Sequence, residues 1–213
     1  MGEPPIFVLT DRSSWRDIKA WFLSGNVAGF PAEYSYALSE VPARRPFGEQ
    51  FRLHRIKDRS EKKPILYLAG SLDIVRRFAK IPHDQARARC LADPQCFVTV
   101  LLPARSLAIA LGMSCDGKVA FRIPTDPNLR NFLVYLGEPL SGTSLNRSGL
   151  SPLQTVEEIQ KSFPGLALVD GGFRPGFPVS PILDLVSFDR KMRRGSWQSV
   201  RSSPRSPFHF GHP

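Results

Sequence analysis

Apolar residues recur every three or four positions in several segments of the chain, the spacing that places them on one face of a helix. Trp15, Ile18 and Phe22 share such a face in the first of these segments. We expect five helices: one after Ser13 or Ser14 that stops at Gly25, one over residues 48–56, one capped by Ser71, one after Thr125 or Asp126 with Gly137 as its C-cap, and one that opens with the capping box of Thr155 and Glu158.

Shorter apolar runs, rich in β-branched and aromatic residues, predict strands. They cover residues 26–30, 65–69, 97–102, 119–123, 166–169 and 182–186. Pro31 is expected to end the first strand, and residues 31–38 to form a strand end and a loop. Strands and helices alternate along the chain, so we predict an α/β fold (mixed α+β), an open sheet with helices packed on it.

The C-terminal residues differ in composition from the rest. From Arg190 onward the chain is basic and rich in serine, proline and glycine, a composition from which no core can be built. We therefore predict one domain over residues 1–196 and a basic Ser/Pro-rich tail over residues 197–213, mobile or draped over the surface. Contact with RNA is the alternative role for this tail.

The strand predicted at residues 119–123 contains an arginine among apolar side chains. Because side chains alternate along a strand, Val119, Phe121 and Ile123 point one way while Ala120 and Arg122 point the other. A guanidinium beside a small residue leaves room for a ligand. An unpaired buried guanidinium is costly, so Arg122 is a candidate binding residue.

A polar stretch follows the fourth helix. Residues 141–149 read Ser-Gly-Thr-Ser-Leu-Asn-Arg-Ser-Gly, with Leu145 as their one large apolar side chain. We expect this stretch to form a loop rather than a core strand, with its hydroxyls and open backbone close to a phosphate or carboxylate. A plain Gly/Ser turn is the alternative interpretation.

Composition narrows the class of protein. Apolar residues make up 42% of the 213 residues, as in a globular protein, and no run reaches the ~18–20 apolar residues of a membrane helix. The N-terminus lacks the basic and apolar segments of a secretory signal, so we expect a cytoplasmic location. The three cysteines have no CxxC spacing and the four histidines do not cluster, which argues against a disulfide framework or a metal site. The net charge of +10 predicts a polyanionic partner, either nucleic acid or nucleotide phosphates.

Five short motifs follow one another in an order and spacing that resemble one family. They are Pro31-Ala32-Glu33-Tyr34-Ser35-Tyr36-Ala37-Leu38, Lys57-Asp58-Arg59, Gln95-Cys96 with Thr99, Val119-Ala120-Phe121-Arg122-Ile123-Pro124, and Thr143-Ser144-Leu145-Asn146-Arg147-Ser148-Gly149. Over residues 12–196 the chain resembles the YrdC-like family and looks closest to its short single-domain bacterial branch. Members include the threonylcarbamoyl-AMP synthases, which start the threonylcarbamoyl modification of adenosine in tRNA.

The resemblance implies a single-domain YrdC-like fold with a twisted open sheet, and a nucleotidyltransferase activity. Its substrates would be threonine, bicarbonate and ATP, with Mg²⁺ carried in by ATP, and its product would pass to a tRNA-modifying transferase complex. The site residues implied are the catalytic and phosphate-binding pair Lys57 and Arg59, the further nucleotide-binding residues Lys63, Lys118, Asn146 and Arg194, and the substrate-binding residues Arg122, Ser144 and Ser180. Of these, Arg122 would bind the threonine carboxylate.

The chain departs from the family pattern at several positions. Ala32 and Tyr34 replace the two threonines of Pro-Thr-Glu-Thr, Leu145 replaces an alanine, and Pro181 replaces the threonine after Ser180. Ala37 and Gln95-Cys96 likewise replace a glycine and Gly-Pro. These changes leave two alternatives open: a non-catalytic YrdC-like RNA-binding protein in tRNA or ribosome maturation, or an adenylating relative with another amino-acid substrate.

Overall fold

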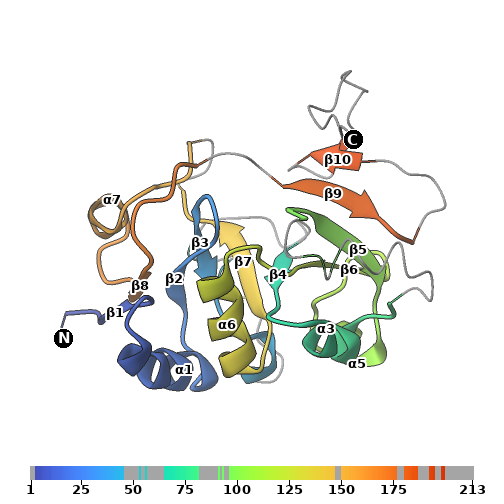
Figure 1. Ribbon diagram of the computed structural model, residues 1–213, viewed down its shortest axis with the longest axis horizontal. Helices are drawn as coiled ribbons and strands as arrows, with labels where there is room; N and C mark the ends of the chain where they lie inside the picture. The colour runs from blue at the N-terminus through green and yellow to red at the C-terminus, as the bar shows by residue number, and fades with distance from the viewer. Residues whose placement is uncertain are drawn as a thin grey trace, which may run out of the picture.

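A strongly twisted sheet with helices packed against it forms the body of the protein (Figure 1). This computed structural model describes residues 3–45, 53, 56, 65–81, 91, 93, 96–146, 150–176 and 180–186, and the backbone alone of 192–194 and 198–199. Within these residues, eleven strands form one mixed sheet in the order β1-β8-β2-β3-β7-β4-β6-β5-β9-β10-β11. The strands are Ile6–Val8 (β1), Ala28–Pro31 (β2), Tyr36–Ser39 (β3), Leu66–Leu68 (β4), Thr99–Pro103 (β5), Lys118–Arg122 (β6), Leu140–Ser144 (β7), Leu168–Asp170 (β8), Pro181–Asp184 (β9), Met192–Arg194 (β10) and Gln198–Ser199 (β11).

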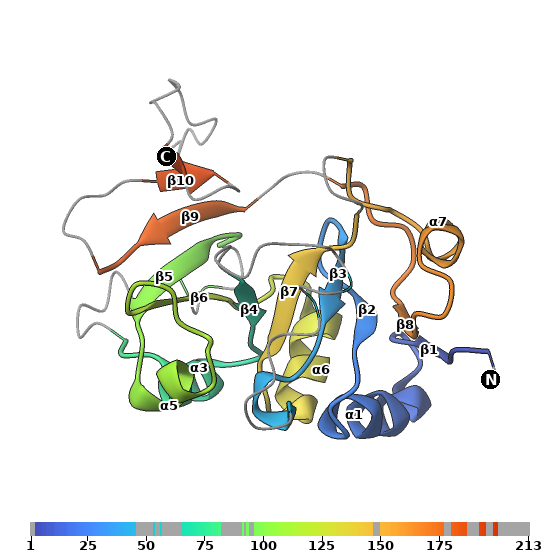
Figure 2. The same ribbon diagram turned by 180° about the vertical axis from the view of Figure 1, so that it is seen from behind.

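The strand order places distant parts of the chain side by side. Strand β7 lies between β3 and β4 and runs antiparallel to both. Strand β1 pairs in parallel with β8, and β4 pairs in parallel with β6. The view from behind shows β7 crossing the middle of the sheet (Figure 2). The predicted α/β architecture, with helices on an open mixed sheet, is confirmed.

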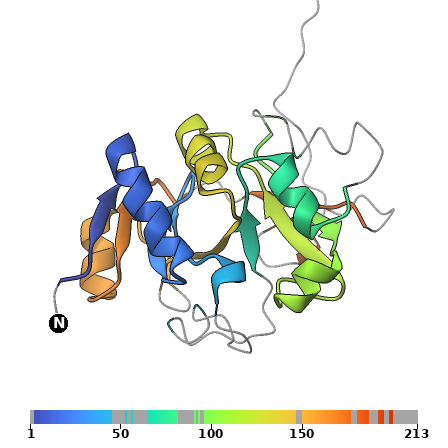
Figure 3. The same ribbon diagram turned by 90° about the horizontal axis from the view of Figure 1, so that it is seen from below.

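Helices pack on both faces of this sheet. They are Trp15–Leu23 (α1), Leu72–Phe78 (α3), Ser106–Ala110 (α5), Pro127–Leu136 (α6) and Val156–Ser162 (α7), with 3-10 turns at Arg12–Ser14 (η1) and Pro42–Arg44 (η2). Helices α1 and α6 share an apolar cluster with Leu68, whereas α3, α5 and α7 share another with Tyr67. Because Tyr67 and Leu68 are neighbours in β4, they point to opposite faces. Seen from below, α1 lies beside α6 and α3 beside α5 (Figure 3).

Both predicted ends of α6 and the predicted start of α7 are confirmed in detail. The carboxylate of Asp126 caps α6, Pro127 occupies its first turn, and Gly137 ends it with a left-handed φ of 79°. On α7, the side chains of Thr155 and Glu158 form the reciprocal hydrogen bonds of a capping box. These residues satisfy backbone groups that a helix end leaves unpaired.

The start of α1 differs from the prediction. The side chain of Ser14 makes no capping hydrogen bond. Instead, Asp11 accepts a hydrogen bond from the backbone N–H of Ser13 at 2.9 Å and starts the turn η1, which continues into α1. The carboxylate two residues upstream takes the capping position, so the serines lie inside the turn. Gly25, with φ at 78°, stops the helix as predicted.

The strand predicted at residues 26–30 is β2, which begins two residues later, at Ala28, and ends at Pro31 as expected. Pro31 lies inside β2 as its last residue, where it pairs with Tyr36 of β3. The segment 31–38 was expected to be a strand end and a loop, but its residues 36–38 belong to the fully buried strand β3, Tyr36–Ser39. A proline at a strand end removes only one backbone donor, so it does not prevent this antiparallel pair.

The polar stretch at residues 141–149 is where the sequence prediction is wrong, since its first four residues belong to the central strand β7. Ser141 is fully buried. Its hydroxyl donates to the carbonyl of Glu40 at 3.1 Å and accepts from the Glu40 N–H at 3.0 Å. A buried hydroxyl that is hydrogen-bonded in this way avoids the desolvation cost that would exclude it from a sheet.

Some predictions fall outside the described residues. These include most of the helix expected at 48–56 and most of the predicted tail, of which Gln198–Ser199 pairs with β10. The domain boundary at residue 196 therefore stays a prediction. In the part of the chain that the structure describes, no helix is long and apolar enough to cross a membrane.

Candidate functional site

One face of the sheet carries four of the residues to which the sequence assigns a role. The registers of β7 with β4, β4 with β6, β6 with β5 and β5 with β9 are all fixed by pairing. Cross-strand partners share a face, and so do alternate residues of one strand. The face that carries Lys118, Arg122, Ser144 and Ser180 is called the site face below.

Helices cover the site face only in part. Leu68 and Leu140 belong to it and pack under α6. Further along, across β6, β5 and β9, the described cluster consists of the buried strand residues Leu101, Ala120 and Ile182, with partly buried Leu66 of β4 packed against them. Ala120, whose small side chain was predicted to leave space beside Arg122, belongs to this cluster.

Arg122 ends β6 and faces Glu33, which lies in the loop between β2 and β3. The Arg122 Nε and the Glu33 Oε2 are 3.5 Å apart, and the two side chains are only 9% and 5% exposed. The other carboxylate oxygen, Oε1, accepts hydrogen bonds from the Thr125 N–H at 2.5 Å and its hydroxyl at 3.0 Å. Glu33 is thus anchored at one oxygen and presents the second to Arg122.

Nε of Arg122 and Oε2 of Glu33 are both buried, and neither has a hydrogen-bond partner within the described residues. Burial lowers the pKa of Arg122 from its usual range, while the Glu33 carboxylate raises it in compensation. The guanidinium carbon of Arg122 lies 4.9 Å from the ring centroid of Phe97, and the rings of Phe97 and Tyr34 pack in a T-shaped arrangement. An aromatic face next to a guanidinium favours its charged form.

Ser180 lies just before β9 and is buried on the site face. Its hydroxyl and that of Thr99 are 2.8 Å apart, so one donates to the other. Thr99 starts β5, two residues after the Phe97 ring that packs on Arg122. The structure therefore brings Ser180 and Arg122 to the same region.

Lys118 lies at the opposite end of β6 from Arg122. Its Nζ is 2.7 Å from the Oδ2 of Asp184, which is 4% exposed and ends β9. Four residues of extended strand separate Lys118 from Arg122, a distance of about 13 Å. The two cations therefore lie on the same face of the sheet, at opposite ends of β6.

Ser144 and Asn146 form a local pair at the end of β7. The Ser144 hydroxyl donates to the Asn146 Oδ1 at 3.0 Å, and the Asn146 amide donates to the carbonyl of Leu150 at 2.6 Å. Ser144 is exposed. The buried side chain of Leu145, which replaces a family alanine, points away from this pair into the core.

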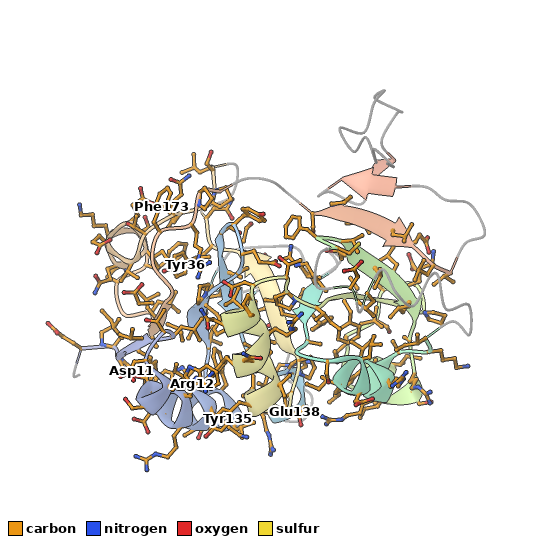
Figure 4. All side chains as sticks on the ribbon, in the orientation of Figure 1. Asp11, Arg12, Tyr36, Tyr135, Glu138 and Phe173 are labelled. Atoms are coloured by element: carbon orange, nitrogen blue, oxygen red, sulfur yellow. The ribbon has the colours of Figure 1, made fainter. Side chains whose placement is uncertain are left out.

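Arg174 is a residue that the sequence analysis did not single out. It donates to the carbonyl of Glu33 at 3.4 Å and to that of Gly171 at 2.8 Å, and lies 3.8 Å from the carboxylate of Asp126. The hydroxyl of Tyr36 donates to the carbonyl of Gly172 at 2.8 Å beside these contacts, next to exposed Phe173 (Figure 4). The loop after β8 is therefore tied to the loop that holds Glu33.

Glu33 was also missed, although a signal for it was present. In Pro31-Ala32-Glu33-Tyr34 both family threonines are replaced, but the acidic residue between them is kept. Other predicted residues cannot be placed. Lys57, Arg59 and Lys63 lie outside the described residues, and only the backbone of Arg194, in β10, is described.

Comparison with known proteins identifies the fold and the family. The family model Sua5/YciO/YrdC, described as "Telomere recombination", matches residues 22–195. The chain belongs to this family. It is 30% identical to the threonylcarbamoyl-AMP synthase of Hydrogenovibrio crunogenus, over 69% of this chain and 80% of that protein. It is also 30% identical to the synthase of the same name from Dichelobacter nodosus, over 76% of this chain and 84% of that one.

Solved structures of the family have the same fold. E. coli YciO superposes with a TM-score of 0.74 at 18% identity, covering 94% of this chain and 98% of that chain. P. abyssi Sua5 in complex with L-threonine superposes with a TM-score of 0.72 at 21% identity, covering 90% of this chain. The chain spans only 56% of the length of that Sua5 protein.

Proposed function

We propose that this protein is a threonylcarbamoyl-AMP synthase, a nucleotidyltransferase that uses threonine, bicarbonate and ATP. The relatives that carry this name match most of their own length at 30% identity. The observation that carries the proposal is the buried Arg122 guanidinium on the site face, beside the hydroxyls of Thr99 and Ser180. A buried cation flanked by hydroxyls suits a small polar acid.

On this proposal, Arg122 binds the carboxylate of threonine through parallel N–H donors, a geometry that a lysine cannot reproduce. Ser180 and Ser144 supply further hydrogen bonds to the substrate. The nucleotide phosphates are bound by a separate group of cations and an amide: Lys57, Arg59, Lys63, Lys118, Asn146 and Arg194.

The reaction needs charge neutralisation rather than a protein nucleophile. Threonine and bicarbonate condense to a carbamate with loss of water, a carbamate oxygen attacks the α-phosphorus of ATP, and pyrophosphate leaves. Cations beside the α-phosphate and the leaving group stabilise the charge that develops there. The described residues hold no group of three or more His, Cys, Asp or Glu side chains that could bind a metal. We propose that Mg²⁺ enters as part of the Mg–ATP substrate.

The test is the formation of threonylcarbamoyl-AMP from ATP, labelled bicarbonate and threonine, followed by mass spectrometry together with pyrophosphate release. Arg122→Lys should fold and bind ATP but lose threonine-dependent pyrophosphate release. Serine and glycine are tested in parallel, because a response to one of these instead of threonine would indicate a relative with a different substrate.

Wild-type protein that binds ATP but releases no pyrophosphate with any amino acid would overturn the synthase assignment. Binding of tRNA by such an inactive protein would then favour the RNA-binding alternative, which the net charge of +10 also suits. Transfer of the product to tRNA by a partner complex is a separate proposal, tested by adding tRNA and cell extract to the active enzyme.

A further inference from the structure

Where Arg122 meets the loop between β2 and β3, two buried polar atoms of opposite charge have no hydrogen-bond partner among the described residues. They are the Nε donor of Arg122 and the Oε2 acceptor of Glu33. At 3.5 Å they are close enough to attract electrostatically, but this distance lies at the limit for a hydrogen bond. A buried donor and acceptor left in this state normally cost free energy, so their persistence needs a reason.

The anchoring of Glu33 indicates that this arrangement is built. Its Oε1 is held by two donors of Thr125, and its backbone carbonyl is held by Arg174. These contacts come from the segment before α6 and from the loop after β8. They prevent the carboxylate from turning to pair fully with Arg122, and keep Oε2 directed at the guanidinium.

We propose that Glu33 is the residue that recognises the α-amino group of the substrate and accepts its proton. This inference rests on the proposed function for the identity of the substrate as an α-amino acid. An α-amino acid carries a carboxylate and an ammonium on the same carbon. Their charges are opposite in sign to those of the Arg122 guanidinium and the Glu33 carboxylate, respectively. Its carboxylate takes the Arg122 donor and its ammonium donates to Glu33 Oε2, so both unpaired atoms gain partners.

The chemistry of carbamate formation requires such a group. An ammonium has no free lone pair, so the nitrogen must lose a proton before it can attack carbon. In the balanced step, R–NH₃⁺ and HCO₃⁻ give R–NH–COO⁻, water and one proton. Glu33 takes this proton, which can then leave to solvent, and the nitrogen forms the new bond to carbon.

The proposal makes Glu33 a specificity residue as well. The ion pair has no net charge, so it fits a zwitterion better than a plain carboxylic acid, whose lone negative charge would face Glu33. The charged and titratable groups around Glu33 in the described residues are Arg122, Tyr34 and Arg174, with Asp126 behind Arg174. None of them replaces Glu33 as an acceptor facing the guanidinium.

Binding is the first test, because it does not require turnover. Calorimetry with full-length protein compares L-threonine with 3-hydroxybutanoate, which lacks the amino group, and with threoninol, which lacks the carboxylate. Wild type should bind threonine and neither analogue. Glu33→Gln should lose about 10- to 100-fold in threonine affinity, the range expected for a charge-assisted hydrogen bond. Glu138→Gln is the matched control and should bind as wild type does, because Glu138 follows the opposite end of α6 and forms a partly exposed ion pair with Arg77.

The pH profile of pyrophosphate release is the second test, because a merely structural residue would not change it. As pH rises, more threonine carries a neutral amine, so Glu33→Gln should recover activity relative to wild type, up to tenfold per pH unit. Glu33→Asp should retain more activity than Glu33→Gln at neutral pH. Melting curves confirm that each variant is folded.

The outcomes separate this inference from the proposed function. Folded Glu33→Gln with wild-type threonine affinity and an unchanged pH profile would overturn the role of Glu33 while the synthase assignment stands. Tight binding of 3-hydroxybutanoate to wild type, or no amino-acid binding at all, would also overturn it. Glu33-dependent threonine binding without product formation would support the role of Glu33 and count against the synthase.

Discussion

The pair formed by Arg122 and Glu33 should have an asymmetric effect on folding stability. A buried charge that loses its partner is left uncompensated, which typically costs about 3–5 kcal/mol, whereas the loss of both charges can be nearly neutral. We therefore expect Arg122→Leu and Glu33→Leu to lower the free energy of unfolding strongly, and the double variant to be more stable than either. Urea denaturation of the four proteins measures this coupling; additive effects would contradict it.

The hydroxyl pair of Thr99 and Ser180 should behave differently, because neither partner is charged. Ser180→Ala leaves the Thr99 hydroxyl buried without this hydrogen bond, and the expected loss is about 1–3 kcal/mol. Ser144→Ala serves as the control, because Ser144 is an exposed serine at the end of β7. This variant should change the free energy of unfolding little. Equal effects in the two variants would show that the buried pair contributes nothing specific.

The buried tyrosines predict a loss of stability in alkali. Burial raises the pKa of Tyr67, and also that of Tyr36. In the unfolded chain these phenols ionise near pH 10, so above that pH the unfolded state binds fewer protons than the folded state. The contribution of these two tyrosines to the free energy of unfolding should then be constant below about pH 9 and fall as pH rises further. Denaturant curves from pH 8 to 11 test this, and Tyr67→Phe should make the fall shallower.

At the scale of elements, the contact between β4 and α6 depends on Gly70. A Cβ at this position would lie 2.3 Å from the backbone nitrogen of Val134 in α6, so the helix would have to shift. Gly70→Ala should therefore cost about 1–3 kcal/mol of unfolding free energy. Gly142→Ala in β7 is the control, because its Cβ would meet only ordinary contacts at 3.6 Å and beyond. A thermal melt of Gly70→Ala equal to that of wild type would contradict this packing.

The elements show what local sequence can and cannot predict. Asp126, Gly137 and Thr155 were predicted correctly because each acts on its own neighbours in the chain. Strand β7 was missed because the hydrogen-bond partner of Ser141 is Glu40, 101 residues away. Periodicity and composition carry no information about a partner at that separation, and a hydroxyl-rich segment then resembles a loop.

The same limit applies to the site. Arg122 could be singled out, because a guanidinium in an apolar strand is conspicuous and the surrounding motif resembles a known one. Glu33 gave a weaker signal, since a glutamate in a loop is ordinary until its burial against Arg122 and Thr125 is seen. Arg174 lies after β8, and nothing in its own neighbourhood points to the carbonyl of Glu33.

At the scale of the whole molecule, the basic C-terminal residues should matter for binding of nucleic acid but not for stability. Residues 200–213 contain no run of apolar residues that could build a core. A chain that ends at residue 199 should keep the wild-type melting temperature, and if tRNA binds, its affinity should show a shallower salt dependence because fewer counterions are released. A large drop in melting temperature would show that this segment is docked on the domain.

The position of β7 between β3 and β4 sets a time order for the protein as it leaves the ribosome. Strands β3 and β4 end by residue 68, but the strand that joins them spans Leu140–Ser144. Until that segment has emerged, the nascent chain exposes two strand edges that have no native neighbour to pair with. Long-range pairing is slow, and open strand edges attract other strands. The ribosome covers the last ~30–40 residues of a growing chain, so β7 emerges only when the chain reaches about 180 residues. Shorter nascent chains are therefore those that most need protection by chaperones.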